Sequence, residues 1–189
     1  YNISFSPFYG TNLLVKNLID KILSIIFLII LSPIMIIVSI LVLLQEGLPI
    51  IYKQKRTGWD GKSFIIYKFR TLSASSDASE DKQVRRGDRR VTFLGSIFRR
   101  FSIDELPQFV NVLKGDMSIV GPRPHPIGQI KYFSAEIINF MQRHKCLPGL
   151  TGWAQINGFR GPKNEAQMDK RFQHDLYYIK NWNLMLDLY

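Results

Sequence analysis

The stretch ILSIIFLIILSPIMIIVSILVLL, residues 22–44, decides the fold of this chain. It contains no charged residue, and 19 of its 23 residues are Ile, Leu, Val, Met or Phe, the others being Ser24, Ser32, Pro33 and Ser39. About 20 apolar residues span the hydrocarbon core of a bilayer as a helix, so we expect this run to lie in a membrane. The run is too long for the apolar region of a signal peptide, and no small-residue cleavage site follows it.

A proline interrupts the middle of this run. Pro33 removes one helical hydrogen bond and clashes with the carbonyl of Ile29, which predicts a kink at Ser32, whose hydroxyl is placed to bond a freed carbonyl. Basic residues flank both ends of the run, whereas a spanning helix usually carries its Lys/Arg excess on one side. Two interpretations stay open: a kinked single-pass helix, or a re-entrant helix-break-helix that returns both basic flanks to the cytoplasmic leaflet. The flanking residues are Lys16, Lys21, Lys53, Lys55 and Arg56.

The charge of the chain lies almost entirely after this run. The sequence has 25 Lys and Arg against 15 Asp and Glu, a net charge of +10, and only Lys16, Asp20 and Lys21 precede residue 45. This excess favours polyanionic partners, namely anionic lipid, phosphorylated substrates or nucleic acid. A single cysteine, Cys146, excludes an intrachain disulfide framework and favours a reducing compartment. The three scattered histidines predict no zinc site.

We therefore predict an α-rich α+β fold in three parts: a juxtamembrane segment over 1–21, the membrane helix over 22–44 and a small domain on the cytoplasmic face over 45–189. Two short strands predict a minor hairpin around the turn 58–61. A Ser- and charge-rich surface loop is expected over 73–90. Apolar periodicity predicts amphipathic helices over 93–101, 106–113, 127–141 and 165–180. Because Tyr1 rather than Met begins the sequence, we expect a processed or excised N-terminus.

Two adjacent carboxylates stand at the start of an apolar helical pattern. In Ser102-Ile103-Asp104-Glu105, the Ser and Glu have the spacing of a capping box, and acidic residues are common in a first helical turn without any catalytic role. Pro107 also fits a helix that begins near Ile103 or Asp104. Free backbone N–H groups would then lie beside the carboxylates, and such a terminus binds phosphate readily. Both a structural and a catalytic role stay open.

Several cations accompany this pair in sequence. In Gly121-Pro122-Arg123-Pro124, two prolines either expose Arg123 on a rigid turn or preorganise its guanidinium for phosphate. Lys68 and Arg70 alternate with aromatic residues, so one face of a strand is cationic. Arg99 lies about one turn before the carboxylates. Together with the membrane segment, these residues predict metal-assisted phosphoryl chemistry at a bilayer surface.

Three long stretches carry a family resemblance. They are IYKQKRTGWDGKSFIIYKFRTL (51–72), SIDELPQFVNVLKGDMSIVGPRPH (102–125) and RHKCLPGLTGWAQINGFRGP (143–162). The chain resembles the bacterial sugar transferase family, the monotopic polyprenyl-phosphate phosphoglycosyl transferases, and within it the undecaprenyl-phosphate glucose or hexose phosphotransferases of exopolysaccharide synthesis. The resemblance implies an enzyme of the bacterial inner membrane, with its site on the cytoplasmic face. That enzyme moves a hexose-1-phosphate from a UDP-sugar to undecaprenyl phosphate, releases UMP and so primes glycan synthesis.

The resemblance also implies roles for individual residues. Asp104 matches the nucleophile that forms an aspartyl-phosphosugar intermediate and holds Mg²⁺, and Glu105 completes the catalytic pair. Lys68, Arg99 and Arg123 match basic residues around the phosphates, and Ser32 and Pro33 match the break in a re-entrant membrane helix. The sequence departs from its relatives at Tyr189, where many continue for another helix, and it lacks the N-terminal segments of larger members.

Other functions remain in view. The same reaction on an N-acetylated or deoxyamino UDP-sugar is the first alternative, and a homo-oligomer stays open. The second alternative is a non-catalytic, membrane-anchored basic module that binds anionic lipid or nucleic acid. A polyanion binder has no use for Asp104 and Glu105 among its arginines. We therefore expect a UDP-sugar, polyprenyl phosphate and membrane lipid as partners, and no nucleic acid.

Overall fold

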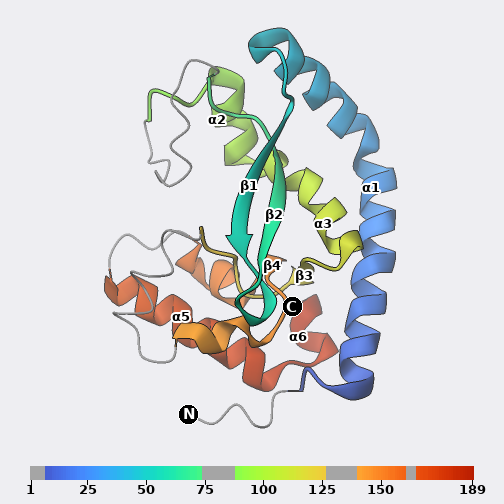
Figure 1. Ribbon diagram of the computed structural model, residues 1–189, viewed down its shortest axis with the longest axis vertical. Helices are drawn as coiled ribbons and strands as arrows, with labels where there is room; N and C mark the ends of the chain where they lie inside the picture. The colour runs from blue at the N-terminus through green and yellow to red at the C-terminus, as the bar shows by residue number, and fades with distance from the viewer. Residues whose placement is uncertain (1–6, 74–87, 127–139, 161–164) are drawn as a thin grey trace.

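One helix runs along the whole molecule. In the computed structural model, which describes residues 7–73, 88–126, 140–160 and 165–189, helix α1 (Gly10–Glu46) flanks the rest of the chain and curves around it (Figure 1). Within those ranges it is the one helix long and apolar enough to cross a membrane. Many of its large apolar side chains are exposed, among them Ile29, Ile30 and Ile37. Residues 11–20 extend the apolar run as part of the same helix.

The proline of α1 is accommodated locally. Pro33 lies inside the helix, which continues through it. The Ser32 hydroxyl donates a hydrogen bond of 2.8 Å to the carbonyl oxygen of Ile29. This carbonyl is the one that Pro33 deprives of its helical N–H partner. The predicted compensation by Ser32 is thus present.

The predicted hairpin is confirmed and is longer than expected. Strands β1 (Ile51–Thr57) and β2 (Ser63–Phe69) pair antiparallel, with Ile51 opposite Phe69, and the short 3₁₀ turn η1 (Trp59–Gly61) joins them. The charged second half of β1 was not predicted as strand, because its residues Lys53 and Lys55 are exposed and do not continue the apolar run. The hairpin stands beside α1, with α2 and α3 close by (Figure 1).

The segment after the hairpin differs from the prediction in detail. Helix α2 (Phe93–Arg100) is as expected, and the side chain of Thr92 caps it by accepting a 3.0 Å bond from the Gly95 N–H. The predicted helix over 106–113 is instead a 3₁₀ helix, η2 (Ile103–Gln108), followed by the short helix α3 (Phe109–Lys114). Pro107 lies inside η2, where its missing N–H interrupts regular α-helical bonding.

A second, parallel sheet was not foreseen. Strands β3 (Ser118–Val120) and β4 (Gly149–Thr151) pair in register Ser118 to Gly149. Three-residue strands show no alternation that a sequence pattern can detect. The remaining elements are η3 (Phe140–Lys145), the π-helical turn η4 (Gln155–Phe159), α5 (Glu165–Asn181) and α6 (Leu184–Leu188).

The helix predicted over 165–180 is confirmed as α5. Most of the helix predicted over 127–141, and most of the loop predicted over 73–90, lie outside the described residues. Among the described residues, no group of three or more His, Cys, Asp or Glu side chains is arranged to hold a metal ion. The observed architecture is mostly helical with two small sheets, in agreement with the predicted α-rich class.

The core contacts α1 along both of its halves. Val38 and Val42 pack with Phe69 and Phe98 in one apolar cluster, and Phe27 of α1 lies 5.3 Å from Phe109, ring centre to ring centre. At the opposite end, Phe8, just before α1, packs with Tyr178 and Trp182 of the C-terminal region. The part of the chain that follows α1 therefore packs along the length of this helix and not against one end of it alone.

Candidate active site

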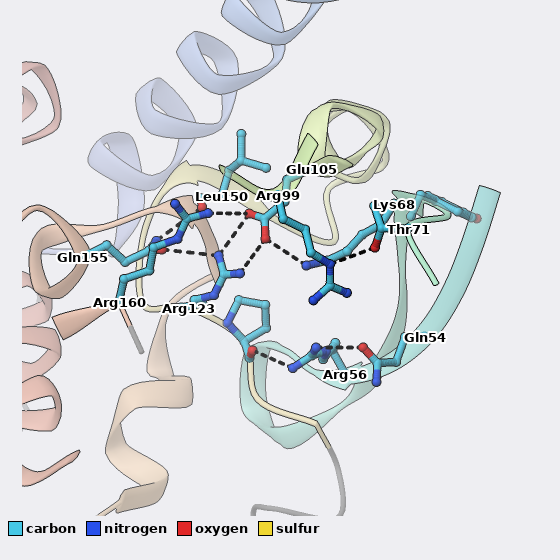
Figure 2. Close-up of polar contacts among 12 residues, drawn as sticks. Gln54, Arg56, Lys68, Thr71, Arg99, Glu105, Arg123, Leu150, Gln155 and Arg160 are labelled. Atoms are coloured by element: carbon cyan, nitrogen blue, oxygen red, sulfur yellow. Dashed lines mark hydrogen bonds and ion pairs between the residues drawn. The ribbon is translucent and has the colours of Figure 1, made fainter. Parts of the chain in front are cut away.

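Glu105 lies at the centre of a cluster of cations. It lies in the first turn of η2. Ser102, the residue just before η2, has a left-handed backbone conformation (φ 59°). The capping box does not form: the Ser102 side chain makes no capping bond, and its backbone carbonyl accepts the Glu105 N–H at 3.1 Å. The Glu105 carboxylate is instead free to face the hairpin, where Lys68 Nζ donates to its Oε1 at 2.9 Å (Figure 2).

Arginines complete the shell of Glu105. The Arg123 guanidinium is bidentate, with NH1 donating to Oε2 at 3.1 Å and NH2 donating to Oε1. Arg160 NH2 lies 3.7 Å from Oε2. Burial raises the pKa of Glu105, but hydrogen bonds and charge from Arg123, together with Lys68, outweigh it and hold that pKa far below its usual 4.5. Glu105 is therefore a permanently ionised carboxylate whose oxygens are already occupied.

Asp104 next to it is in the opposite situation. It is only 7% exposed, yet within the described residues its carboxylate makes no ion pair and no hydrogen bond to another side chain. Burial raises the pKa of Asp104; the charge of Lys68 opposes this shift, the charge of Glu105 reinforces it, and Arg99 opposes it as well. A backbone N–H also bonds to this carboxylate. A buried carboxylate that has cations nearby but no side-chain partner among the described residues is suited to attack a phosphorus atom or to ligate a cation.

The predicted basic residues converge on this pair. Lys68 lies on β2 and Arg123 follows β3, while Arg99 comes from the end of α2, where its Nε donates to Thr71 Oγ1 at 2.8 Å. Arg70 does not join them, because its guanidinium donates to the backbone carbonyls of Leu72 and Leu48. Ser32 and Pro33 are exposed on α1, and no contact joins them to the described residues of the cluster. Five of the predicted residues, Lys68, Arg99, Asp104, Glu105 and Arg123, therefore come together in space.

Buried arginines fix the backbone of the Arg123 loop. Arg143 NH2 and Arg171 NH2 both donate to the carbonyl oxygen of Arg123, at 2.8 and 3.3 Å. Arg143 also pairs with Asp175 at 2.7 Å, and both of these side chains are 3% exposed. Sequence reasoning missed this set. The spacing of Arg171 and Asp175, four residues apart on one predicted helix, was the one available signal.

The glycine-rich stretch serves close packing against the same loop. A Cβ on Gly149 would lie 2.1 Å from the Gly121 nitrogen, and a Cβ on Gly152 would lie 2.1 Å from the Gly121 oxygen. Only glycine permits this approach of two backbones. The crossing brings Gln155, whose Oε1 lies 3.3 Å from Arg123 NH1, and then Arg160 to the site. Arg160, half exposed, is a second residue that sequence reasoning missed.

The cluster has an excess of positive charge. Among the described residues, Lys68, Arg99, Arg123 and Arg160 face two carboxylates, Asp104 and Glu105. Burial lowers the pKa of nearby Arg56 to about 10, and the charge of Arg123 adds to that shift. Two uncompensated positive charges in a partly buried site favour an anion such as a diphosphate.

A magnesium ion fits these residues in one way. Mg²⁺ is commonly held by one or two carboxylates together with substrate phosphates, and keeps several waters. Among the described residues the Asp104 carboxylate has no side-chain partner and is suited to this, whereas the oxygens of Glu105 are bound by Lys68 and Arg123. These ligands suit an ion shared between Asp104 and a bound diphosphate. They do not suit an ion that the protein holds without the diphosphate.

Comparisons with known proteins agree with this chemistry. The bacterial sugar transferase family model matches residues 11–189. The chain is 42% identical over 184 residues to UDP-glucose:undecaprenyl-phosphate glucose-1-phosphate transferase of Escherichia coli (strain K12), covering 97% of this chain and 40% of that protein. It is 39% identical to UDP-N-acetylgalactosamine-undecaprenyl-phosphate N-acetylgalactosaminephosphotransferase of Aeromonas hydrophila, covering 97% and 42%.

A shorter relative aligns over most of both chains. The exopolysaccharide production protein PSS of Rhizobium leguminosarum bv. phaseoli is 38% identical over 182 residues, which cover 94% of this chain and 91% of that protein. By contrast, the chain spans about 40% of the length of the larger relatives. The match covers α1, the hairpin and every element of the cation cluster. The chain belongs to the bacterial sugar transferase family.

Proposed function

We propose that this chain transfers a sugar-1-phosphate from a UDP-sugar to undecaprenyl phosphate at a membrane surface, releasing UMP. The observation that carries this proposal is the contrast between two adjacent buried carboxylates: Glu105 is saturated by cations and Asp104 is not. A binding module for polyanions gains nothing from a carboxylate in its basic surface that no described side chain neutralises. A phosphoryl-transfer enzyme needs one, as a nucleophile.

The proposed reaction has two displacement steps at the same phosphorus atom. An Asp104 oxygen attacks the β-phosphorus of the UDP-sugar, the bond from that phosphorus to the bridging oxygen breaks, and UMP leaves with the bond electrons. The resulting acyl phosphate carries the sugar. A phosphate oxygen of undecaprenyl phosphate then attacks the β-phosphorus, and the Asp104 carboxylate is regenerated as the polyprenyl diphosphate sugar forms.

Glu105 has a different role in this proposal. With its pKa far below 4.5 it is ionised at every working pH, so it is not a general acid or base. It holds Lys68 and Arg123 in fixed positions, where their remaining N–H groups, with Arg99 and Arg160, face the substrate phosphates. Preorganised cations of this kind stabilise the charge that develops on the leaving UMP.

Mg²⁺ is part of the proposal. Asp104 and the diphosphate would hold the ion, which when bound supplies charge neutralisation at the phosphates. The chain's own cations share that task. Because Asp104 is the carboxylate of the site that has no side-chain partner among the described residues, its replacement should weaken Mg²⁺ binding as well as remove the nucleophile.

The placement of α1 supports a re-entrant arrangement in the cytoplasmic leaflet of the bacterial inner membrane. The body contacts α1 from Asp20, which accepts a bond from Ser118, to Val42, which packs in the hairpin cluster. These residues are about 33 Å apart along a straight helix, close to the thickness of the hydrocarbon core. A helix that crossed the bilayer would carry the charged body through the membrane with it. In the re-entrant arrangement α1, which is continuous through Pro33, bends at Ser32–Pro33 so that both ends lie on one side of the membrane.

Cysteine labelling tests this topology. Cysteines placed at Asn12 and at Lys62 should both react only with reagent that reaches the cytoplasm, since both flanks lie on that face. Reaction of the Asn12 probe with an impermeant reagent added to the outside of intact cells would establish an ordinary spanning helix instead.

The sugar is proposed to be a glucose-type hexose. Larger relatives are named for UDP-glucose, and the Aeromonas relative is named for UDP-N-acetylgalactosamine. The name of the shorter relative links it to exopolysaccharide production, which supports a role as the priming enzyme of such a glycan. Release of UMP from a panel of UDP-sugars, including N-acetylated and deoxyamino sugars, decides between these substrates.

The decisive experiment isolates the first step. Purified protein is mixed with Mg²⁺ and a UDP-sugar labelled in the sugar, without polyprenyl phosphate. Wild type should retain base-labile label on the protein, whereas Asp104→Asn should retain none. Asp169→Asn, the same change at an exposed carboxylate of α5, should label like wild type. Steady-state kinetics should give parallel double-reciprocal lines. Intersecting lines with no labelled protein would show a ternary complex and leave Asp104 as a metal ligand or a base.

A further inference from the structure

A second buried charged cluster joins α1 to the C-terminal region. Lys16 and Asp20 lie one turn apart on α1, and both are less than 5% exposed. The Lys16 ammonium lies 3.1 Å from Asp20 Oδ1 and 2.7 Å from Oδ2 of Asp187, a residue of α6. Asp187 in turn accepts bonds from Tyr178 and Trp182, at 2.8 and 3.1 Å.

The same cluster holds the strand that leads into the active site. Ser118 Oγ donates to Asp20 Oδ2 at 2.7 Å, and the Ile119 N–H lies 3.4 Å from Asp20 Oδ1. The hydroxyl of Tyr178 is 2.8 Å from the carbonyl oxygen of Val120. These three residues are the whole of β3, and the chain then passes through Gly121 and Pro122 directly to Arg123. Asp20 on α1 therefore bonds directly to β3, and β3 is followed within three residues by Arg123, the cation that binds Glu105.

Stability alone does not account for these charges. A buried ion pair loses much of its Coulomb attraction to desolvation, and apolar residues of similar volume often stabilise a protein as well or better. What charged groups add is a fixed register between packed elements. The rest of α1 contacts the body mainly through apolar side chains such as Val38 and Val42, and such contacts tolerate sliding and rotation.

We propose that Lys16 and Asp20 are positioning residues, which set the register between the membrane helix and β3 and thereby the depth at which the Arg123 loop faces the bilayer. The proposal rests on the proposed function. UDP-sugar reaches the site from water, and its binding depends on the cations of the site. The polyprenyl phosphate reaches the same site from the lipid layer in which α1 lies. A change of register should therefore weaken the use of the lipid substrate more than the use of the soluble one.

The kinetic test compares two lysines of the same helix. Lys16→Met removes the cation of the cluster, and Lys21→Met removes an exposed cation five residues later as a matched control. In Lys16→Met and in Asp20→Asn, the KM for polyprenyl phosphate should rise about tenfold, the effect of a coupling of ordinary size, while the KM for UDP-sugar stays within about twofold. Lys16→Arg, which retains the cation, should recover much of the loss, and Lys21→Met should match wild type.

A second readout does not need activity. Amide hydrogen exchange over residues 118–123 should be faster in Asp20→Asn than in wild type or Lys21→Met, because Asp20 no longer accepts bonds from both Ser118 and Ile119. If Lys16→Met or Asp20→Asn does not fold, Ser118→Ala removes one of these bonds and should show the same pattern more weakly. A wild type without transferase activity refutes the proposed function and leaves this readout intact. Unchanged exchange, or equal rises in both KM values, would overturn the positioning role.

Discussion

Two regions of charged side chains meet at Arg123, and they differ in how far they are exposed to solvent. Behind the loop, Arg143, Arg171 and Asp175 are all less than 5% exposed and bind the Arg123 carbonyl oxygen or each other. In front of it, the Arg123 guanidinium shares Glu105 with Lys68 and with Arg160, whose side chain is 49% exposed. The rear region is closed to solvent, and the front region is open and carries unbalanced positive charge.

The difference separates structure from chemistry. Ions that are fully desolvated and bound to backbone hold a loop in place, and water or substrate does not reach them. Ions at a partly open surface can exchange contacts with an incoming phosphate, here where one carboxylate is saturated by cations and its neighbour has no described side-chain partner. Both regions are rich in arginine, so composition alone does not distinguish them. Mutations in each should therefore differ in what they reduce, stability or turnover.

The largest effect is expected in the closed region. Arg143→Met should lower the free energy of unfolding by about 3–5 kcal/mol, because it leaves the Asp175 carboxylate buried without its ion pair. Denaturant unfolding in detergent measures this. The control is Lys145→Met, two residues on, whose pair with Asp60 is more than half exposed on both sides and should contribute less than about 0.5 kcal/mol. Equal stability of the two variants would show that the buried Arg143–Asp175 pair contributes no more to stability than an exposed ion pair does.

A smaller effect is expected in the open region, and on activity. Arg123→Lys should lower kcat/KM by about 10–100-fold with little change in stability, since an ammonium keeps the charge but cannot bridge both oxygens of Glu105 and still face a phosphate. Arg100→Lys, an exposed arginine of α2, serves as the control. Near-normal turnover of Arg123→Lys would show that the planar fork is dispensable.

The smallest effect is a pH dependence at the edge of the closed region. Burial, with a further contribution from Arg143, lowers the pKa of His144 to about 4 from 6.5. Between pH 6.5 and 4 the unfolded chain therefore binds a proton that the folded chain does not, so stability falls as the pH falls through this window. His144→Gln should reduce that loss by about 1 kcal/mol at pH 5.5. Parallel stability curves for wild type and variant would mean that water reaches His144.

Much of the open region was predictable. In the cluster, Lys68, Asp104, Glu105 and Arg123 were found because they belong to long, specific family motifs, and Arg99 lies just before the second of these stretches. The inference from local pattern alone was weaker. Ser102 and Glu105 have capping-box spacing, but the left-handed backbone of Ser102 and the cations around Glu105 override it. A local pattern fails where a tertiary ion pair is worth more than a helix cap.

The sequence by itself determined the apolar helix, the hairpin, the basic character of the body and the family, because each depends on residue type and local spacing. Only the tertiary structure decided that Glu105 is saturated while Asp104 is not, that Arg143 and Arg171 converge on one carbonyl oxygen, and that Asp20 binds β3. These contacts join residues tens of positions apart. Desolvation and the partners of each charge exist only once the chain has folded, so a carboxylate's state cannot be read from its neighbours in sequence.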